Sequence, residues 1–437
     1  MTGSSTAPGE SEPSGPPSAS ARNFLIVTAS YWGFTLTDGA LRMLVLFYFF
    51  KLGYSPFTLA FLFLLYEAAG IASNVVGGWL ASRYGIPRML AVGQILQIAG
   101  LILLSMLDPA WTVALSVTWV VACQGLAGVA KDLTKTASKS AIKVTSVEGA
   151  GQLFRWVAFF TGSKNAMKGV GFFLGGLLLE VTGFRTALWM LAGLIAVILA
   201  AGLIALPRQL GKAEASKTVK ELFGKTPAVN LLAAARVFLF GARDVWFVVG
   251  LPVFLYATGW TFIQVGAFLA AWTIGYGVVQ AIAPSFVTRS EDGLSKEVPG
   301  ARLWSLMLVI VPVVLAVILV VPGVPRPDLI VAGGLVLFGF LFAVNSSLHS
   351  YLILAYAGSK KAAEDVGFYY AANASGRFIG ILLSGALYQV GGMTACLIGS
   401  AVLLALCWAF TLLLPTEVMA RSAGREPEQP LPSGSAQ

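Results

Sequence analysis

Residues 154–183, FRWVAFFTGSKNAMKGVGFFLGGLLLEVTG, form an apolar, glycine-rich segment that is long enough to cross a bilayer and carries Lys164 and Lys168 in its middle. A lysine at bilayer depth is costly, so it normally faces a protein interior or an aqueous cavity. Two lysines one helical turn apart lie on the same face of a helix. The segment therefore indicates either a cavity that receives negative charge or two lysines that pair with acids on neighbouring helices.

The composition sets the class of protein. The chain has 437 residues, of which 57% are hydrophobic and only 11% are charged, and its mean hydropathy is +0.81. A water-soluble globule does not have this composition. The net charge of +9 would suit nucleic acid only if the basic residues were gathered on a soluble face, whereas they are strung out between apolar segments. We therefore predict an all-α polytopic membrane protein that contacts the lipid bilayer and binds no nucleic acid.

Apolar segments long enough to cross a hydrocarbon layer of about 30 Å recur along the chain. They lie at residues 24–50, 57–82, 89–107, 111–135, 154–182, 185–206, 228–257, 262–288, 302–321, 328–356, 366–390 and 393–414. The sequence thus predicts twelve transmembrane helices.

Polar stretches divide the chain. We expect disordered or polar cytoplasmic tails at residues 1–22 and 415–437, and a cytoplasmic linker at 207–226 between an N-terminal six-helix half, 23–206, and a C-terminal six-helix half, 227–414. Most of the 29 Lys and Arg residues lie in tails, loops and helix ends that face the cytoplasm if both termini are inside. The expected location is the cell inner (plasma) membrane, with a multi-pass chain and both termini cytoplasmic.

The two halves repeat each other at fixed spacings. An offset of 206 places Phe34 on Phe240, Asp38 on Asp244, Gly53 on Gly259 and Tyr54 on Trp260. An offset of 209 places Phe159 on Phe368, Lys168 on Arg377, Gly171 on Gly380, Gly176 on Gly385, Val181 on Val390 and Gly183 on Gly392. Chance matching among common Gly and Phe residues is the alternative, but it accounts less easily for the charged matches. Repeats of this kind place substrate sites at the interface of the halves.

Basic residues outnumber acids inside the apolar segments. The basic residues are Arg42, Lys131, Lys164, Lys168, Arg236, Arg243 and Arg377, and the acids are Asp38, Glu67, Asp132 and Asp244. Pairing alone leaves an excess of positive charge, which an anionic small-molecule substrate would balance. We expect Lys131 and Arg236, which lie near the predicted cytoplasmic ends, to extend toward the interface.

The candidate substrate-binding residues combine ammonium and guanidinium groups with two amides. They are Arg42, Lys164, Lys168, Asn165, Arg243, Arg377 and Asn373. Guanidinium forks and ammonium groups suit the oxygens of carboxylates and phosphates. The two asparagines either donate hydrogen bonds to a ligand or only pack between helices.

A second set is predicted to couple transport to an ion gradient or to form ion pairs. It consists of Asp38, Asp244, Glu67 and His349, the last being the single histidine of the chain. These groups are the candidates to carry a proton in antiport, although a solitary histidine on an apolar helix is more often a packed polar residue. Asp38 and Arg42 have the spacing of an i, i+4 pair, so they either satisfy each other or contact a ligand. Arg243 and Asp244 are neighbours that point in different directions, so we expect them to pair less easily.

Two parallel six-helix halves joined by a basic loop resemble the major facilitator fold. The stretch GGWLASRYGIPR, residues 77–88, is similar to that superfamily's signature between its second and third helices, with Gly78, Arg83, Gly85 and Arg88 in matching positions. The resemblance implies that these four residues form a gating loop. Ser82 stands where the family usually has an acid, so the gating ion pair that this acid makes is not expected here.

Several long runs resemble the ArsJ family of organoarsenical efflux permeases. They are YWGFTLTDGALRMLVL (31–46), NVVGGWLASRYG (74–85), GLAGVAKDLTKTASKSAIK (125–143), FTGSKNAMKGVGFFLGG (160–176), RVFLFGARDVWFVVGLPVFLY (236–256) and WTIGYGVVQAIAP (272–284). This resemblance implies export of 1-arseno-3-phosphoglycerate by alternating access, functional coupling to the glyceraldehyde-3-phosphate dehydrogenase that makes this compound, and arsenate resistance. The alternative is a major facilitator permease for another organophosphate or organic anion.

Other classes of protein find little support in the sequence. Cys123, Cys396 and Cys407 have no metal-ligand or redox spacing, and we see no nucleotide-binding loop or nucleophile motif. We therefore expect no enzyme activity, no catalytic residue, no metal and no cofactor, and energy from a gradient rather than from ATP. A membrane-embedded enzyme would need a catalytic cluster, and a receptor or scaffold would not need charges repeated in both halves. The chain is expected to act as a monomer.

Overall fold

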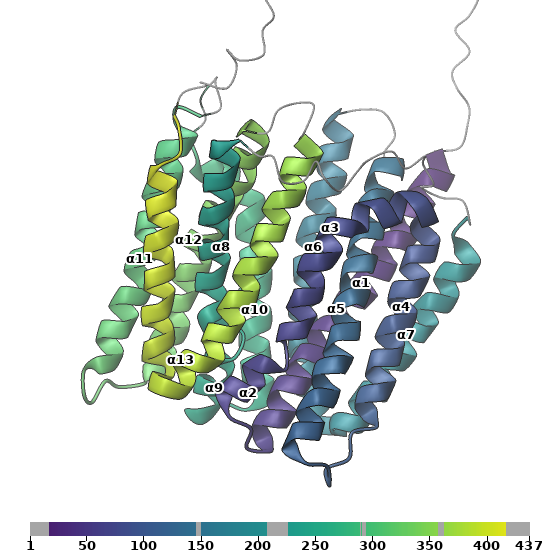
Figure 1. Ribbon diagram of the computed structural model, residues 1–437, viewed down its shortest axis with the longest axis horizontal. Helices are drawn as coiled ribbons and strands as arrows, with labels where there is room; N and C mark the ends of the chain where they lie inside the picture. The colour runs from purple at the N-terminus through teal and green to yellow at the C-terminus, as the bar shows by residue number, and fades with distance from the viewer. Residues whose placement is uncertain are drawn as a thin grey trace, which may run out of the picture.

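The computed structural model describes residues 17–145, 150–207, 226–288, 290, 294–356 and 362–416, and within them the chain is a bundle of helices without strands (Figure 1). Most of the predicted linker and the whole of the predicted tail after residue 416 lie outside the described residues. The helices of the first half are α1 (Pro17–Lys51), α2 (Pro56–Phe61), α3 (Leu64–Tyr84), α4 (Ile86–Ser105), α5 (Val113–Thr145), α6 (Ala150–Thr182) and α7 (Phe184–Ala205).

The second half begins after the linker and contains one short 3-10 turn. Its helices are α8 (Pro227–Phe247), α9 (Gly250–Ala257), α10 (Phe262–Ile282), η2 (Ala283–Phe286), α11 (Glu297–Val320), α12 (Pro327–Tyr356) and α13 (Ala362–Leu412). The last of these is two helices that meet at Gly391 and Gly392, where the backbone leaves the helical region. With α2–α3 and α8–α9 each counted as one broken helix, the described chain crosses the bundle twelve times, as the sequence predicts.

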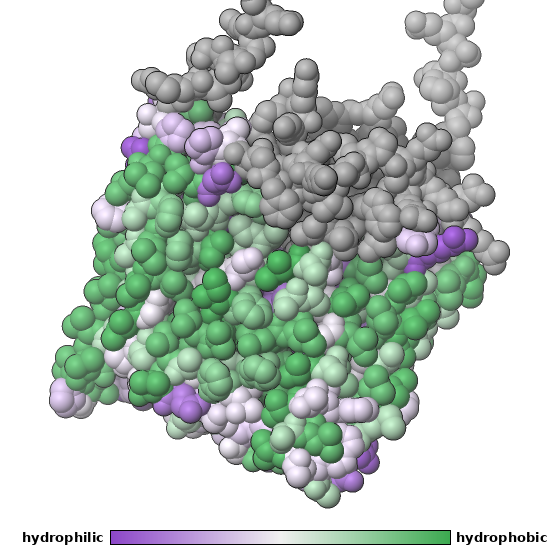
Figure 2. Space-filling model, viewed as in Figure 1, coloured by the Kyte–Doolittle hydropathy of each residue, from purple (hydrophilic) through white to green (hydrophobic). Residues whose placement is uncertain are grey.

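The surface of the bundle fits a bilayer. Ten of the described helical stretches are long and apolar enough to cross a membrane. Figure 2 shows a broad apolar belt around the middle of the visible face, with hydrophilic residues toward its two ends. We call the end at which α1 begins and α13 finishes the termini end, and the other end, which holds α2, α9 and the bend of α13, the opposite end (Figure 1).

Helix boundaries differ from the predictions mainly at the termini end. Helix α1 begins at Pro17 rather than at residue 24, so part of the predicted tail is helical, and α5 continues to Thr145 instead of stopping at 135. Hydropathy locates the part of a helix that crosses the hydrocarbon layer. Backbone hydrogen bonding within the helix continues past that layer, because polar residues are compatible with a helix in water.

The predicted repeat appears as the same local geometry at the opposite end. Gly53 ends α1 with φ 84°, and Gly259 ends α9 with φ 100°. In both places the amide of the next residue donates back to a carbonyl five positions earlier, from Tyr54 to Phe49 and from Trp260 to Leu255, each at 3.1 Å. Glycine is favoured here because this helix ending requires a left-handed backbone. The two endings are therefore copies of one motif.

The helix that follows each of these endings starts in the same way. The hydroxyl of Ser55 accepts the amide of Thr58 at 3.2 Å before α2, and the hydroxyl of Thr261 accepts the amide of Gln264 at 3.2 Å before α10. Both residues thereby satisfy one of the free amide groups of a helix N-terminus. Ser55 and Thr261 are related by the offset of 206 found in the sequence.

Glycines set the spacing of the inner helices. A β-carbon on Gly171 of α6 would lie 2.3 Å from the carbonyl oxygen of Leu36 in α1, and one on Gly380 of α13 would lie 2.6 Å from the carbonyl oxygen of Gly241 in α8. Small residues permit such close approach of helix backbones. Each half therefore holds a tightly packed helix pair at its centre.

The same two glycine-rich helices also make contacts between the halves. A β-carbon on Gly176 would lie 2.6 Å from the carbonyl oxygen of Phe262, and one on Gly385 would lie 2.4 Å from the carbonyl oxygen of Pro56. Gly176 and Gly385 are related by the offset of 209, and Pro56 and Phe262 by the offset of 206. The interface between the halves is therefore pseudo-symmetric.

Aromatic rings close the opposite end between the halves. The ring of Phe47 in α1 stacks on that of Phe262 in α10 with centroids 4.7 Å apart, and the ring of Phe50 meets that of Tyr256 edge-on at 5.5 Å. Phe262 also stacks on Tyr256 at 4.5 Å. These contacts form one continuous aromatic layer across the interface.

Replacing Gly171 by alanine should destabilise the fold, because the added methyl group meets backbone atoms that cannot move independently. We expect a loss of about 1–3 kcal/mol, the usual cost of overpacking. The measurement is thermal unfolding of the purified protein in detergent. Gly193→Ala is the matched control, since a β-carbon there would meet nothing within 4 Å. Equal melting temperatures for the two variants would contradict the packing argument.

Candidate functional site

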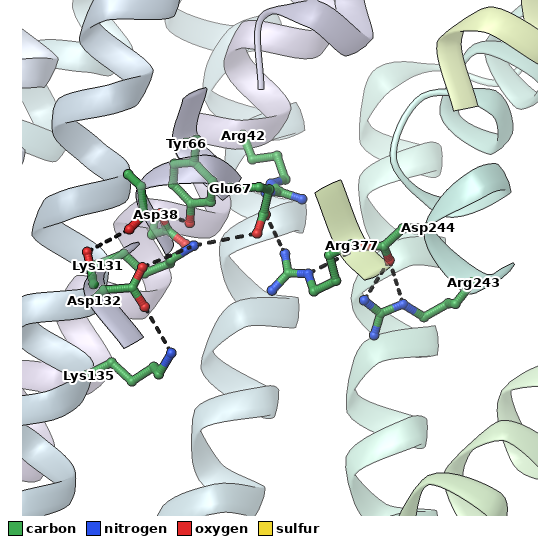
Figure 3. Close-up of polar contacts among 12 residues, drawn as sticks. Asp38, Arg42, Tyr66, Glu67, Lys131, Asp132, Lys135, Arg243, Asp244 and Arg377 are labelled. Atoms are coloured by element: carbon green, nitrogen blue, oxygen red, sulfur yellow. Dashed lines mark hydrogen bonds and ion pairs between the residues drawn. The ribbon is translucent and has the colours of Figure 1, made fainter. Parts of the chain in front are cut away.

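A buried carboxylate, Glu67 of α3, lies at the centre of the charged network (Figure 3). It accepts hydrogen bonds from Nη2 of Arg42 at 2.7 Å and from Nη2 of Arg377 at 2.6 Å. Nζ of Lys131 lies 3.8 Å away on a third side. Because Glu67 is 1% exposed, its charge depends on these partners rather than on water.

Arg377 connects the two halves of the molecule. This residue of α13 donates from Nε to Asp244 of α8 at 3.2 Å while its Nη2 binds Glu67 in the first half. Asp244 is also bound by Arg243, whose Nε lies 2.6 Å from Oδ1. These neighbours were expected from the sequence to pair less easily than residues one helical turn apart. Their pairing is possible because the long arginine side chain curls back to the carboxylate, as Figure 3 shows.

The other two acids of the network have separate partners. Oδ1 of Asp38 accepts the hydroxyl of Tyr66 at 2.6 Å, and Oδ1 of Asp132 accepts Nζ of Lys135 at 2.9 Å. Asp38 and Arg42 therefore do not form the i, i+4 ion pair that their spacing allows, because Glu67 offers Arg42 a closer partner across the helix interface. Lys131 sits over the ring of Tyr66, 3.8 Å from its centroid.

A cavity of about 150 Å³ adjoins this network between the halves. Five cationic side chains and three carboxylates line it, together with tyrosines and small polar groups. The lining residues are Tyr31, Phe34, Thr35, Asp38, Glu67, Gly70, Lys131, Asp132, Lys135, Lys164, Lys168, Tyr370, Asn373, Ala374 and Arg377. The structure thus brings Lys164, Lys168, Arg377 and Asn373 of the predicted set to one cavity, with Asp38 and Glu67.

Lys168 differs from the other cations of the cavity. It forms no ion pair with any residue in the described part of the chain, and its Nζ lies 5.6 Å from the ring centroid of Phe172. Its backbone is held firmly, because a β-carbon on Gly39 of α1 would lie 2.8 Å from the carbonyl oxygen of Lys168. A cation fixed in a cavity without a carboxylate partner is suited to an incoming anion.

Other predicted residues lie outside the cavity wall. Arg42 pairs with Glu67 of the cavity wall, whereas Arg243 pairs with Asp244, which lies behind Arg377. Asn165 donates to Oε1 of Gln280 in α10 at 3.3 Å, which is a contact between the halves. His349 is fully buried in α12, away from the cavity, and neither ring nitrogen has a hydrogen-bond partner among the described residues.

The predicted gating loop is described only in part. Gly85 has φ 80° and precedes the first turn of α4, and Arg88 is exposed. Gly78 and Arg83 belong to α3, but their side chains lie outside the described residues.

Sequence reasoning missed several groups that belong to the site. Tyr31, Tyr66, Lys131, Asp132, Lys135 and Tyr370 bind or line it. Lys131 was expected to reach the interface, but it lies at the cavity, where its Nζ is 3.8 Å from Glu67 and 3.9 Å from Asp132. Lys131 and Lys135 are one helical turn apart, as Lys164 and Lys168 are. This spacing could have indicated that they share one face of their helix.

Arg236 was also predicted wrongly. It is 4% exposed and donates from Nη1 to the carbonyl oxygen and the hydroxyl of Ser346, both at 3.0 Å. Its guanidinium lies 4.2 Å from the ring centroid of Phe240. Oxygen acceptors on α12 and aromatic faces hold it inside the second half, so it does not extend to the interface.

Within the described residues, twelve crossings of the bundle in two repeated halves, with a charged cavity between them, are typical of membrane transport proteins. Comparison with known families supports this class: residues 23–381 match the model of the Major Facilitator Superfamily. The chain therefore belongs to the Major Facilitator Superfamily.

Solved structures of other transporters share the fold. The nucleoside transporter NupG is similar with a TM-score of 0.68 and 13% identity, over 91% of this chain and 98% of that one. A POT family transporter in complex with a thioalcohol-conjugated peptide has a TM-score of 0.70 and 13% identity, over 90% and 96% of the two chains. A POT family transporter in complex with 5-aminolevulinic acid has a TM-score of 0.68 and 14% identity, over 92% and 96%. No match was found among curated proteins.

Replacing Glu67 by glutamine should destabilise the protein strongly, because Arg42 loses its carboxylate and Arg377 loses one of two. Removing one partner of a buried ion pair typically costs about 3–5 kcal/mol. The measurement is thermal unfolding in detergent of Glu67→Gln, Arg42→Met and the double variant. We expect the double variant to be more stable than the sum of the single losses, since it removes a cation that Glu67→Gln leaves unpaired. Additive losses would argue against direct coupling of these side chains.

Proposed function

We propose that this protein is a secondary active exporter of an organoarsenical phospho-anion, 1-arseno-3-phosphoglycerate, and that it confers arsenate resistance by alternating access. The proposal rests on Lys164, Lys168 and Arg377, which converge on one cavity between the halves. The family and the runs that resemble the ArsJ permeases support it as well.

The chemistry of the cavity suits a polyanion. A molecule that carries a carboxylate, a phosphate ester and an acyl arsenate offers several oxyanions to the cationic wall, and guanidinium groups bind such oxygens in a bidentate manner. Lys168 has no carboxylate to give up, whereas Arg377 would exchange Glu67 or Asp244 for the substrate. Exchange of Glu67 would loosen the bond between the halves, which links binding to movement, whereas the bond from Arg377 to Asp244 lies within the second half.

The small volume of the cavity indicates that the halves have to move before a substrate can bind. Ligand pockets usually have volumes of about 300–1,000 Å³, whereas the cavity measures about 150 Å³. The halves, residues 23–206 and 227–414, would therefore shift against each other to admit the substrate, with residues 207–226 as the connection. A single chain contains both halves of the site, so a monomer suffices.

The proposed direction of transport is outward. The distribution of Lys and Arg favours a cytoplasmic position for the termini end. The aromatic layer of Phe47, Phe50, Tyr256 and Phe262 then closes the outer side, and substrate made by glyceraldehyde-3-phosphate dehydrogenase would enter from the cytoplasm. Asp38, Glu67 and Asp244 are the acids placed to couple this export to protons.

The second candidate is a permease for another organophosphate or organic anion. The excess of cations at the cavity favours an anionic substrate in both cases, and it does not by itself select the arsenic ester. The cellular assay below separates the two.

The test of the proposed function is arsenic content and growth in arsenate of cells that lack their own arsenic pumps. The cells express this protein with and without glyceraldehyde-3-phosphate dehydrogenase. We expect resistance and low cellular arsenic only when both proteins are present. Resistance without the dehydrogenase, or none with it, would overturn the arsenical substrate and leave the organic-anion permease.

Lys168→Gln should lower export at least about tenfold, since loss of one charged contact to an oxyanion is worth about 1.4 kcal/mol or more. Lys168→Arg should retain part of the activity, because it keeps the charge. Arg326→Gln is the control, as its side chain is 68% exposed at the opposite end. Initial rates in inverted membrane vesicles, corrected for protein amount, provide the measurement. Unchanged export by well-expressed Lys168→Gln would remove this residue from the site.

A further inference from the structure

A second polar cavity lies on the outside of the first half, away from the charged network. It has a volume of about 410 Å³ and lies between α1, α4 and α7 near the termini end. Its lining consists of Ser30, Pro87, Arg88, Leu90, Ala91, Gln94, Leu199, Gly202, Leu203 and Leu206. None of these residues is acidic, and none belongs to the wall of the central cavity.

The inner part of this groove contains an amide with unmet hydrogen-bonding capacity. Gln94 is 2% exposed, and its Nε2 has no hydrogen-bond partner in the part of the chain that the structure describes. A buried amide that donates no hydrogen bond costs roughly 1–3 kcal/mol. Such a group is normally satisfied by water or by a ligand. Because Gln94 lines the groove, an acceptor atom placed there would satisfy it.

The rim of the groove is cationic. Arg88 is exposed and forms no ion pair within the described residues. It belongs to the first turn of α4, a helix of 20 residues with no acidic residue in that turn and no side-chain cap. A helix N-terminus carries partial positive charge and free amide groups, so it adds to the attraction for an anion.

The remaining wall is apolar and faces the bilayer. Leu199 and Leu203 of α7 form it together with Leu206, the residue that follows the helix, and Leu203 is 62% exposed at the surface. A free phosphate ion has no apolar part that could pack against this wall. A molecule with a phosphate next to hydrocarbon chains would use both parts of the groove.

We propose that this groove binds an anionic phospholipid. The phosphate would lie at Arg88 and the first turn of α4, Gln94 would donate to an ester carbonyl oxygen of the glycerol backbone, and an acyl chain would lie along Leu199 and Leu203. Basic pockets between transmembrane helices bind anionic headgroups in this manner. The site is separate from the substrate cavity and does not depend on the arsenical proposal.

The experiment is native mass spectrometry of the full-length protein, delipidated in detergent and titrated with phosphatidylglycerol or phosphatidylcholine of the same acyl chains. The wild type should prefer phosphatidylglycerol by about tenfold, which corresponds to about 1.4 kcal/mol. Arg88→Gln should reduce this preference to about threefold or less, whereas Gln94→Leu should weaken the binding of both lipids by a similar factor, because both carry the ester carbonyl. Arg22→Gln is the matched control, an exposed cation on α1 at the same end that does not line the groove, and it should behave as the wild type.

Thermal unfolding separates loss of the site from loss of the fold. Lipid-free Gln94→Leu should melt at or above the wild-type temperature, because it removes an unsatisfied buried amide, but phosphatidylglycerol should raise its melting temperature less. Equal binding of the two lipids by the wild type, or an equal effect of Arg22→Gln, would overturn the proposal. Full protection by inorganic phosphate alone would likewise overturn it, by showing that the groove takes a free anion.

Discussion

Glu67 accepts hydrogen bonds from guanidinium groups of both halves, and the arrangement of the inner helices depends on this shared carboxylate. In a low-dielectric interior an ion without a partner costs several kcal/mol, so the side chains around Glu67 are not independent. Removing one partner changes the charge balance of the others. Arg377 carries this constraint to Asp244 in the second half. The two halves are thus held together at their centre by an ion pair between Glu67 and Arg377.

Close backbone packing makes the charge network possible. Gly171 on α6 and Gly380 on α13 let each of these helices approach its neighbour within its own half, while Gly176 and Gly385 let the same helices approach the other half. Side chains on these two helices therefore project into the space between the halves from fixed positions. Lys168 lies on one of them and Arg377 on the other, at related places in the repeat. The duplication thus supplies two cations to the cavity from opposite sides.

Most of the fold could be predicted from the sequence, because apolar length and fixed offsets are properties of local stretches. The offset that relates Gly53 to Gly259 was visible in the sequence and reappears as two left-handed helix endings. Partners of the charged groups could not be predicted in the same way. Spacing along a helix suggested Asp38 for Arg42, but the acceptor is Glu67 on another helix. The sequence shows how far along a transmembrane helix a charged residue lies. Its ion-pair partner on another helix depends on how the helices pack, which no single stretch of sequence encodes.

The aromatic layer at the opposite end adds to the free energy needed to separate the halves there. Two ring pairs, Phe47 with Phe262 and Phe50 with Tyr256, join the halves there. Aromatic pairs contribute about 0.5–1.5 kcal/mol each beyond the area that they bury. Separating both would disfavour a state open at that end by about 1–3 kcal/mol, or roughly 5- to 150-fold in population. Any opening at this end therefore requires free energy to separate these rings.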